Sequence, residues 1–353
     1  MTTQKGVIQQ DEKKDGRTTA GMMIEVNGLS KTFNGTLKAV DNVSFNVKEG
    51  EIFGFLGPNG AGKSTTINML TTLLRPTSGS AVIASHDVLK APNEVRRNVG
   101  VVPQEYTADE DLTGYENIML CADLYGIPRS VSKPRADELL KLVELEDAKG
   151  RKVNTYSGGM RRRLELACGL INHPHLLFLD EPTLGLDVQT RTAVWNYIRK
   201  LKDEYRMTLF MTTHYLEEAD SLCDRIAIID HGKIVKIDSP AGLKNSLGGD
   251  IIELGVKEDD ERISGLISQV KFVKEVKKVD PLNYRIKTEL GEEAVPEVID
   301  VIRENGFHVA KVALTKPTLD QAYLEYTGRS LREEEVSRTQ MMSQRRTMRM
   351  ARS

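Results

Sequence analysis

Short, almost continuous apolar runs alternate along the chain with segments in which apolar residues recur at helical spacing. Three such runs cover residues 51–56, 175–180 and 209–213. Their length and apolar character are typical of buried strands. Residues 65–70, which follow a glycine-containing segment after the first run, can begin a helix. Residues 131–146 place Leu139, Leu140 and Val143 on one buried helix face. This pattern predicts an open α/β sheet covered by helices.

The pattern changes towards the C-terminus. Residues 230–234 predict a hairpin, residues 239–242 start a closing helix, and Gly248-Gly249 indicates a linker. Beyond the linker, strands are expected at 251–254, 272–279, 283–287 and 307–314, with helices at 260–270 and 294–304. This β-α-β-β-α-β order predicts a small α+β domain of the ferredoxin-like type. It shows no cluster of catalytic residue types, so we expect it to regulate the main domain or to support a dimer.

These breaks divide the chain into four parts. The expected parts are a flexible polar tail at 1–21, a main domain at 22–245 with a helical insertion at about 105–165, a small domain at 250–328, and a basic tail at 329–353. Residues 336–353 contain five arginines and no acid. Both a solvated tail and a contact with anionic lipid remain open for them. The three arginines at 161–163 predict a solvated helix face.

The amino-acid composition bears on the number of domains, the partners and the location of the protein. A chain of 353 residues is long enough for more than one domain. A net charge of −2 gives no electrostatic case for nucleic acid as the main partner. The three cysteines have no metal-binding spacing, so we expect them to be reduced. Residues 1–20 lack the apolar centre of a signal peptide, and no stretch approaches the roughly 20 apolar residues of a membrane helix.

Residues 57–65 carry the most specific motif of the chain. They read Gly57, Pro58, Asn59, Gly60, Ala61, Gly62, Lys63, Ser64 and Thr65. The pattern G-x-x-x-x-G-K-[ST] is a phosphate-binding loop, whose backbone N–H groups surround one phosphate. Lys63 can reach the β- and γ-phosphates, and the Ser64 hydroxyl can bind Mg²⁺. The helix that follows adds the positive end of its dipole, so we expect a nucleoside triphosphate site.

A second acidic motif ends the run at 175–180. Asp180 stands at the expected carboxyl end of this strand, where an acid can hold Mg²⁺ through water. Glu181 follows and is the candidate to polarise the attacking water. Two adjacent acids after largely apolar residues cost desolvation energy unless they are used, so we favour catalysis over a merely polar strand end.

Residues 156–160 read Tyr-Ser-Gly-Gly-Met and precede a helical segment. Ser157, Gly158 and Gly159 would present a hydroxyl and free N–H groups, which form a second anion site. With the phosphate loop before it and Asp180-Glu181 after it, the order of motifs resembles the nucleotide-binding subunit of ATP-binding cassette transporters from about residue 24 to 243. The commoner family motif is L-S-G-G-Q, so Tyr156 and Met160 are departures that leave Ser-Gly-Gly intact.

This resemblance implies roles for further residues. Phe33 matches the aromatic residue that stacks on adenine, although a core role at a strand edge is the alternative. Gln104 matches the glutamine of the Mg²⁺ shell, Asp187 matches the loop that crosses the dimer interface, and His214 matches the histidine that senses the γ-phosphate. In the family, two subunits bind two ATP molecules head to tail, and Ser157-Gly158-Gly159 of one contacts the ATP of the other.

The resemblance implies an ATPase with ATP and Mg²⁺ that dimerises and drives a separate multi-spanning permease from the cytoplasmic face of the membrane. Residues 105–115 lie where the family's membrane subunits dock. Residues 315–330 resemble the C-terminal segment of daunorubicin-resistance subunits, which favours export of a drug-like or lipid-like substrate. An ATPase of translation or DNA repair is the rival, but such proteins usually carry two cassettes or long coiled coils. A kinase would leave Ser157 and His214 unexplained, and an uptake system remains open.

Overall fold

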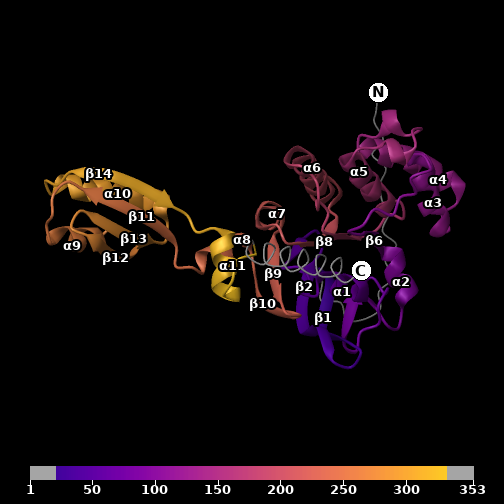
Figure 1. The fold of residues 1–353 in the computed structure, drawn as a ribbon, viewed down its shortest axis with the longest axis horizontal. Helices are drawn as coiled ribbons and strands as arrows, with labels where there is room; N and C mark the ends of the chain where they lie inside the picture. Colours follow the sequence, from indigo (N-terminus) through magenta and orange to yellow (C-terminus); the bar gives the residue numbers. More distant parts are fainter. Residues whose placement is uncertain (1–20, 332–353) are drawn as a thin grey trace, which may run out of the picture.

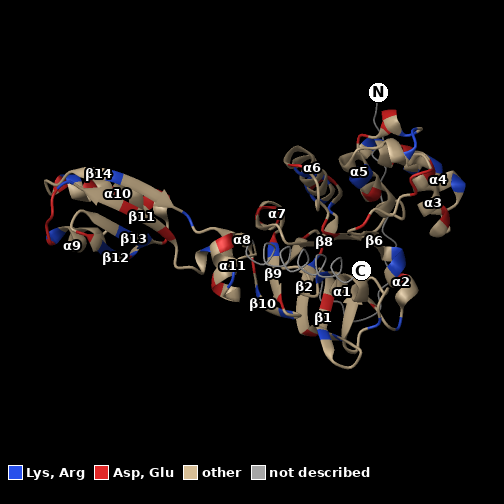
Figure 2. Cartoon of the chain, viewed as in Figure 1, with Lys and Arg blue, Asp and Glu red and all other residues tan. Residues whose placement is uncertain are grey.

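The structure is a computed structural model that describes residues 21–331. A main body and a smaller domain lie side by side along the long axis of the molecule (Figure 1). Basic and acidic residues are interspersed along the ribbon of both parts (Figure 2). Of the helices within residues 21–331, none has the length and apolar character needed to cross a membrane. The predicted tails at 1–20 and 332–353 fall outside the described residues.

A six-stranded sheet is the centre of the main body, with the strand order β10-β9-β3-β8-β7-β6. Its strands in chain order are β3 (Ile52–Leu56), β6 (Val99–Val102), β7 (Leu176–Asp180), β8 (Thr208–Thr213), β9 (Arg225–Asp230) and β10 (Lys233–Asp238). Neighbours are parallel except β10, which pairs antiparallel with β9. The three apolar runs are therefore β3, β7 and β8, and the predicted hairpin is β9–β10.

A second, antiparallel sheet packs against one face of the first. It has the order β2-β1-β4-β5 and consists of β1 (Met22–Phe33), β2 (Leu37–Lys48), β4 (Ser78–Ile83) and β5 (His86–Asp87). Phe53 and Phe55 of β3 face this sheet, and their rings pack against those of Phe45 and Phe210. Ile52 and Leu56 face the opposite core, as the alternation of a strand requires. The sequence pattern did not predict this second sheet.

Helices surround the two sheets. Those of the main body are α1 (Lys63–Leu70), α2 (Pro92–Asn98), α3 (Gly114–Leu124), α4 (Arg129–Leu142), α5 (Gly158–Gly169), α6 (Val188–Tyr205), α7 (Leu216–Leu222) and α8 (Pro240–Asn245). Helices α3, α4 and the start of α5 lie in the predicted helical insertion. Leu139, Leu140 and Val143 are buried there, which confirms that prediction. Helix α4 ends before the predicted residue 146 because Glu144 has a left-handed backbone, with φ 55°.

The small domain has the predicted ferredoxin-like topology. Its elements are β11 (Asp250–Val256), α9 (Arg262–Ser268), β12 (Val273–Asp280), β13 (Asn283–Thr288), α10 (Gly291–Glu304) and β14 (Val309–Thr315). All neighbouring strands pair antiparallel in the order β12-β13-β11-β14. The apolar faces of α9 and α10 share one core with the sheet, so the domain has its own interior.

After the small domain the chain returns to the main body. Helix α11 (Leu319–Thr327) packs on α8 and α7, and its buried Tyr323 belongs to the same core as Leu243. Arg329 then lies 2.6 Å from Asp230. The predicted small domain extended to residue 328 and the predicted tail began at 329. In the structure the small domain is instead an insertion between α8 and α11, as Figure 1 shows.

Candidate nucleotide-binding site

The topology of the central sheet gathers the predicted catalytic residues. Strands β3, β8 and β7 are parallel neighbours, so their carboxyl ends meet at one edge. The phosphate loop follows β3, His214 follows β8, and Asp180 is the last residue of β7. Residues far apart in the sequence therefore form one cluster.

The phosphate loop takes a shape that needs glycine. Gly62 has φ 104°, and a Cβ atom there would lie 2.4 Å from the carbonyl oxygen of Ala39. A Cβ on Gly57 would lie 2.2 Å from the carbonyl oxygen of Ile229. Helix α1 begins immediately after Gly62, and no side chain caps its first N–H groups. An uncapped helix N-terminus behind a glycine loop fits a phosphate. Pro58 and Ala61 are buried, Asn59 and Gly60 are exposed, and Ser64 and Thr65 are half-buried.

Lys63, Glu181 and His214 form the buried centre of the cluster. The Lys63 ammonium donates to the carbonyl oxygen of Gly57 at 2.7 Å and pairs with Glu181 Oε1 at 2.9 Å. The other carboxylate oxygen of Glu181 lies 3.0 Å from His214 Nδ1. Glu181 has a left-handed backbone, with φ 47°, which is uncommon for a residue other than glycine. The predicted phosphate-binding lysine, water-activating acid and sensing histidine are thus in contact.

Two opposing effects set the pKa of Glu181. Burial favours the protonated acid and by itself would raise the pKa. The hydrogen bond from His214 and the positive charge of Lys63 outweigh burial and lower the pKa from 4.5 to about 2. The carboxylate is therefore ionised at neutral pH, as a group that accepts a proton from water must be.

The predicted Mg²⁺ ligands supply only oxygen atoms, which is the donor set that Mg²⁺ prefers. Asp180 accepts a short hydrogen bond from the Thr212 hydroxyl at 2.5 Å, which fixes its carboxylate at the sheet edge. Ser64 is in the first turn of α1, and Gln104 is exposed just beyond the end of β6, the strand next to β7. The residues present therefore fit the ion.

Phe33 is the last residue of β1 and is half-buried. The Lys31 ammonium lies 5.3 Å from the centre of the Phe33 ring, which is a cation–π contact. The ring is not part of the main hydrophobic cores. This location suits the predicted contact with a base better than a role in core packing.

The Ser-Gly-Gly motif lies with the Asp187 loop and not with the phosphate loop of its own chain. Ser157 caps α5 by accepting from the Met160 N–H at 3.2 Å, and Asp187 caps α6. A Cβ on Gly159 would lie 2.4 Å from the Thr190 side chain, so the two loops pack closely. A Cβ on Gly158 would only touch its neighbours, at 3.6 Å. The structure thus brings together these four predicted residues as a second group.

Two residues near the site were missed or misread from the sequence. Thr212 holds Asp180 and also accepts from the Glu181 N–H at 3.0 Å; its place two residues before His214 was the available signal. The prediction of a solvated face at 161–163 was wrong for Arg162, which is only 3% exposed. A run of three identical residues on a helix cannot all face solvent when one side of the helix is packed.

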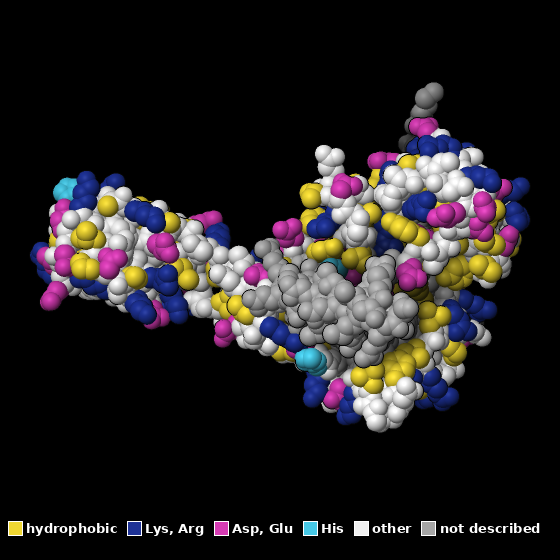
Figure 3. All heavy atoms as spheres, viewed as in Figure 1, with side chains coloured by type: hydrophobic (Ala, Val, Ile, Leu, Met, Phe, Trp, Pro, Cys, Tyr) yellow, Lys and Arg dark blue, Asp and Glu magenta, His cyan; other side chains and the backbone are white. Residues whose placement is uncertain are grey.

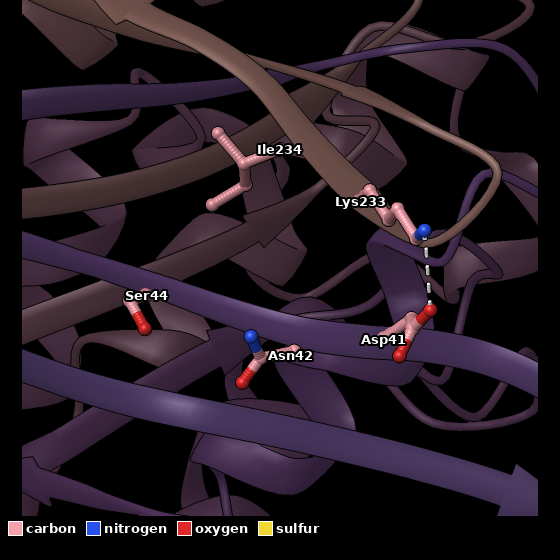
Figure 4. A pocket seen from close by; sticks show the side chains of 5 residues that line it. All are labelled: Asp41, Asn42, Ser44, Lys233 and Ile234. Atoms are coloured by element: carbon pink, nitrogen blue, oxygen red, sulfur yellow. Dashed lines mark ion pairs between the residues drawn. The ribbon is translucent and has the colours of Figure 1, made fainter.

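An open hollow lies beside this site, between β2 and β10 (Figure 4). Asp41, Asn42, Ser44, Lys233 and Ile234 line it. Asp41 and Lys233 form an ion pair at 3.5 Å across its rim. The hollow contains none of the predicted site residues. Gly232, the residue before Lys233 in the chain, donates its N–H to the carbonyl oxygen of Ala61 in the phosphate loop at 3.0 Å.

Comparisons with known proteins agree with this geometry. The family model for ABC transporters matches residues 40–184. The daunorubicin/doxorubicin resistance ATP-binding protein DrrA of Streptomyces peucetius is 42% identical over 86% of this chain and 92% of its own length. The linearmycin resistance ATP-binding protein LnrL of Bacillus subtilis is 36% identical over 88% and 100%. A dimeric post-hydrolysis structure of the ATP-binding cassette MJ0796 bound to ADP and Pi is 30% identical, with a TM-score of 0.56 over 62% of this chain and 98% of that one.

Proposed function

The chain belongs to the ATP-binding cassette transporter family and is an ATP-hydrolysing transporter subunit, and we propose a role in nucleotide binding or hydrolysis for each residue of the site. The contact of Lys63, Glu181 and His214 directly behind a phosphate loop carries the proposal. Lys63 and the N-terminus of α1 bind the phosphates, and Phe33 stacks on the base. Glu181 orients the attacking water and accepts its proton, while His214 holds the Glu181 carboxylate and senses the γ-phosphate.

Ser64, Asp180 and Gln104 would hold Mg²⁺, Asp180 through water, with Thr212 fixing the Asp180 carboxylate. When bound, Mg²⁺ supplies positive charge against the β- and γ-phosphate oxygens. The described residues include no group of three His, Cys, Asp or Glu that could hold an ion by themselves. This suits a site in which the nucleotide provides the remaining ligands.

Two copies of the chain form the working unit, each contributing its Ser157-Gly158-Gly159 motif to the ATP bound by the other. In its own chain this motif packs against the start of α6, where a Cβ on Gly159 would meet Thr190, and this placement supports the proposal. Exposed apolar residues also flank the Asp187 loop: Leu184 is 38% and Val188 75% exposed. Such residues at the end of a loop are suited to an interface that forms only with nucleotide.

A mixing experiment tests the composite site. In a Glu181→Gln background, Ser157→Arg should abolish ATP-dependent dimers while leaving ATP binding to the monomer intact, and Lys63→Ala should lose much of its ATP binding. A mixture of the two variants can assemble one intact site, because both lesions fall in the other. Size-exclusion chromatography with light scattering should then show dimers only in the mixture. Ser80→Arg, on exposed β4, is the control. Dimers of the Ser157→Arg variant alone would reject the arrangement.

We assign the separate permease to the helical side of the main body. Exposed apolar residues gather there, including Leu120, Leu124 and Tyr125 at the end of α3. Hydrophobic side chains are visible between the helical part and the region of α2 in Figure 3. Together with residues 105–115 they offer a surface for a short permease helix at the cytoplasmic face of the membrane. Anionic lipid would attract the basic residues at 336–353, which lie outside the described residues.

The names of three relatives support export as the direction of transport. Two of them are named for daunorubicin and linearmycin resistance, and a third, from Ralstonia nicotianae, is named as a Nod factor export protein. We infer export of an amphipathic, drug-like or lipid-like molecule.

For the small domain, which has a core of its own, we infer a regulatory or dimer-supporting role.

A further inference from the structure

Arg162 is a buried cation whose partners are the backbone of the catalytic loops. It lies in the second turn of α5 and is 3% exposed. Its Nε donates to the Pro182 carbonyl oxygen at 2.6 Å, and its Nη1 donates to that of Pro103 at 2.6 Å. Its Nη2 donates to the carbonyl oxygens of Asp180 at 3.1 Å and Glu181 at 3.0 Å. The planar guanidinium can make these contacts at once because its five donors are fixed in direction.

The neighbouring arginines show that this burial is specific. Arg161 faces the surface and pairs with Glu110, while Arg163 donates to the Val143 carbonyl oxygen at 3.0 Å. Arg161 also donates to the Asn154 carbonyl oxygen at 3.4 Å, and Arg163 to the Tyr197 hydroxyl at 3.4 Å, so these bonds go to other parts of the main body. Burying a charge costs free energy unless hydrogen bonds compensate for the lost water. The four carbonyl groups provide these hydrogen bonds and so hold the Arg162 guanidinium in this position.

By binding these four carbonyl groups, Arg162 fixes the backbone next to three proposed site residues. Holding the carbonyl of Glu181 fixes the peptide plane that follows this residue, whose φ of 47° persists only where its surroundings impose it. The Glu181 carboxylate lies 2.9 Å from the Lys63 ammonium. Holding the carbonyl of Pro103 fixes the peptide that leads into Gln104.

The same helix begins at the second anion site. Ser157 caps α5, and Arg162 is five residues farther along the helix. Because a helix is stiff over this distance, a force on Ser157-Gly158-Gly159 moves the Arg162 guanidinium with it. On the basis of the proposed head-to-tail dimer, we propose that Arg162 is a positioning residue. It transmits the effect of ATP binding at the partner's phosphate loop to Glu181 and Gln104 of its own chain.

In this arrangement each ATP has two effects. It closes the interface, and through α5 it aligns the water-activating acid at the other site. Hydrolysis by the dimer is then cooperative in ATP, with a Hill coefficient above one. Arg162 affects the rate of hydrolysis and its cooperativity in ATP without touching nucleotide.

Substitution of Arg162 in the full-length chain tests the coupling. Arg162→Lys keeps the charge but has one nitrogen, so it cannot bridge all four carbonyl groups. Arg162→Met keeps length and removes the charge. We expect kcat to fall about 10- to 100-fold, as a misplacement of about 1 Å at a catalytic group can cause. The Kd for a fluorescent ATP analogue should stay within about two-fold of wild type, because no nucleotide contact is lost. The Hill coefficient should fall to one, and Arg161→Lys is the matched control.

The outcomes separate this inference from the proposed dimer. If the Glu181→Gln protein forms no dimer with ATP, the proposed function fails. If that dimer forms and Arg162→Lys retains the wild-type kcat and Hill coefficient, only the inference about Arg162 fails. A non-cooperative wild-type dimer also overturns the inference. A parallel loss of ATP affinity and thermal stability in Arg162→Lys would show a purely structural role and overturn it as well.

Discussion

Replacing Glu181 by Gln removes the negative charge between Lys63 and His214. Their distances of 2.9 and 3.0 Å from its two oxygens explain why the pKa of this buried acid falls from 4.5 to about 2. That change corresponds to about 3 kcal/mol of stabilisation of the ionised form. Since the folded pKa is the lower one, this contribution is complete above pH 4.5 and is lost as the pH falls towards 2.

The Glu181→Gln protein should therefore be less stable than wild type at pH 7 in the absence of nucleotide. A loss of up to about 3 kcal/mol lowers Tm by several degrees, at roughly 2–4 °C per kcal/mol for a domain of this size. The Tm difference between the two proteins should shrink below pH 4.5. Turnover of ATP should fall roughly 10²- to 10⁴-fold, because the amide cannot accept a proton from water.

Differential scanning calorimetry and a steady-state phosphate-release assay measure the two effects. Glu217→Gln is the matched control, since Glu217 is exposed on α7 one residue before a buried glutamate. Near-normal hydrolysis by Glu181→Gln would reject Glu181 as the residue that activates water. A Tm equal to that of Glu217→Gln would refute the assignment of the ion pair as a stabilising contact.

Four further changes have defined expectations. Lys63→Ala should weaken ATP binding by about ten-fold or more in calorimetric titration, since a hydrogen bond to a charged group contributes roughly 1.5–3 kcal/mol, with Lys90→Ala as the exposed control. Tyr323→Ala should destabilise the main domain by roughly 3–5 kcal/mol in denaturant unfolding, because its side chain is buried in that core. Asp111→Lys, at an exposed position in the segment 105–115, should uncouple transport in proteoliposomes while basal hydrolysis stays within about two-fold. Deleting residues 336–353 should at most weaken membrane association, and added salt should reduce the difference from the full chain.

Local motifs were predictable because their chemistry is contained in a few adjacent residues. The glycines before Lys63 are recognisable as a phosphate loop, and Asp180 and Glu181 are recognisable as acids at the end of a buried strand. The structure brings both motifs together at one sheet edge. The ferredoxin-like domain was also predictable, because its six elements follow one another in the order β-α-β-β-α-β with short connections between them.

Features that depend on contacts distant in the sequence were not predictable. Burial of Arg162 requires the ends of β6 and β7 to be beside α5, which a run of three arginines does not reveal. Helix α11 joins the main core through Tyr323, although the sequence places it directly after the small domain. The sheet of β1, β2, β4 and β5 alternates apolar and polar residues irregularly, since several register shifts interrupt the β1–β2 pairing.

Purification of the native full-length chain from detergent-solubilised membranes, with mass spectrometry of the proteins that elute with it, tests the central claim most directly. Our account predicts a multi-spanning membrane protein in near-equal amount with the ATPase. Recovery of the chain on ribosomes or DNA, with no membrane protein bound, would contradict the assignment to a transporter.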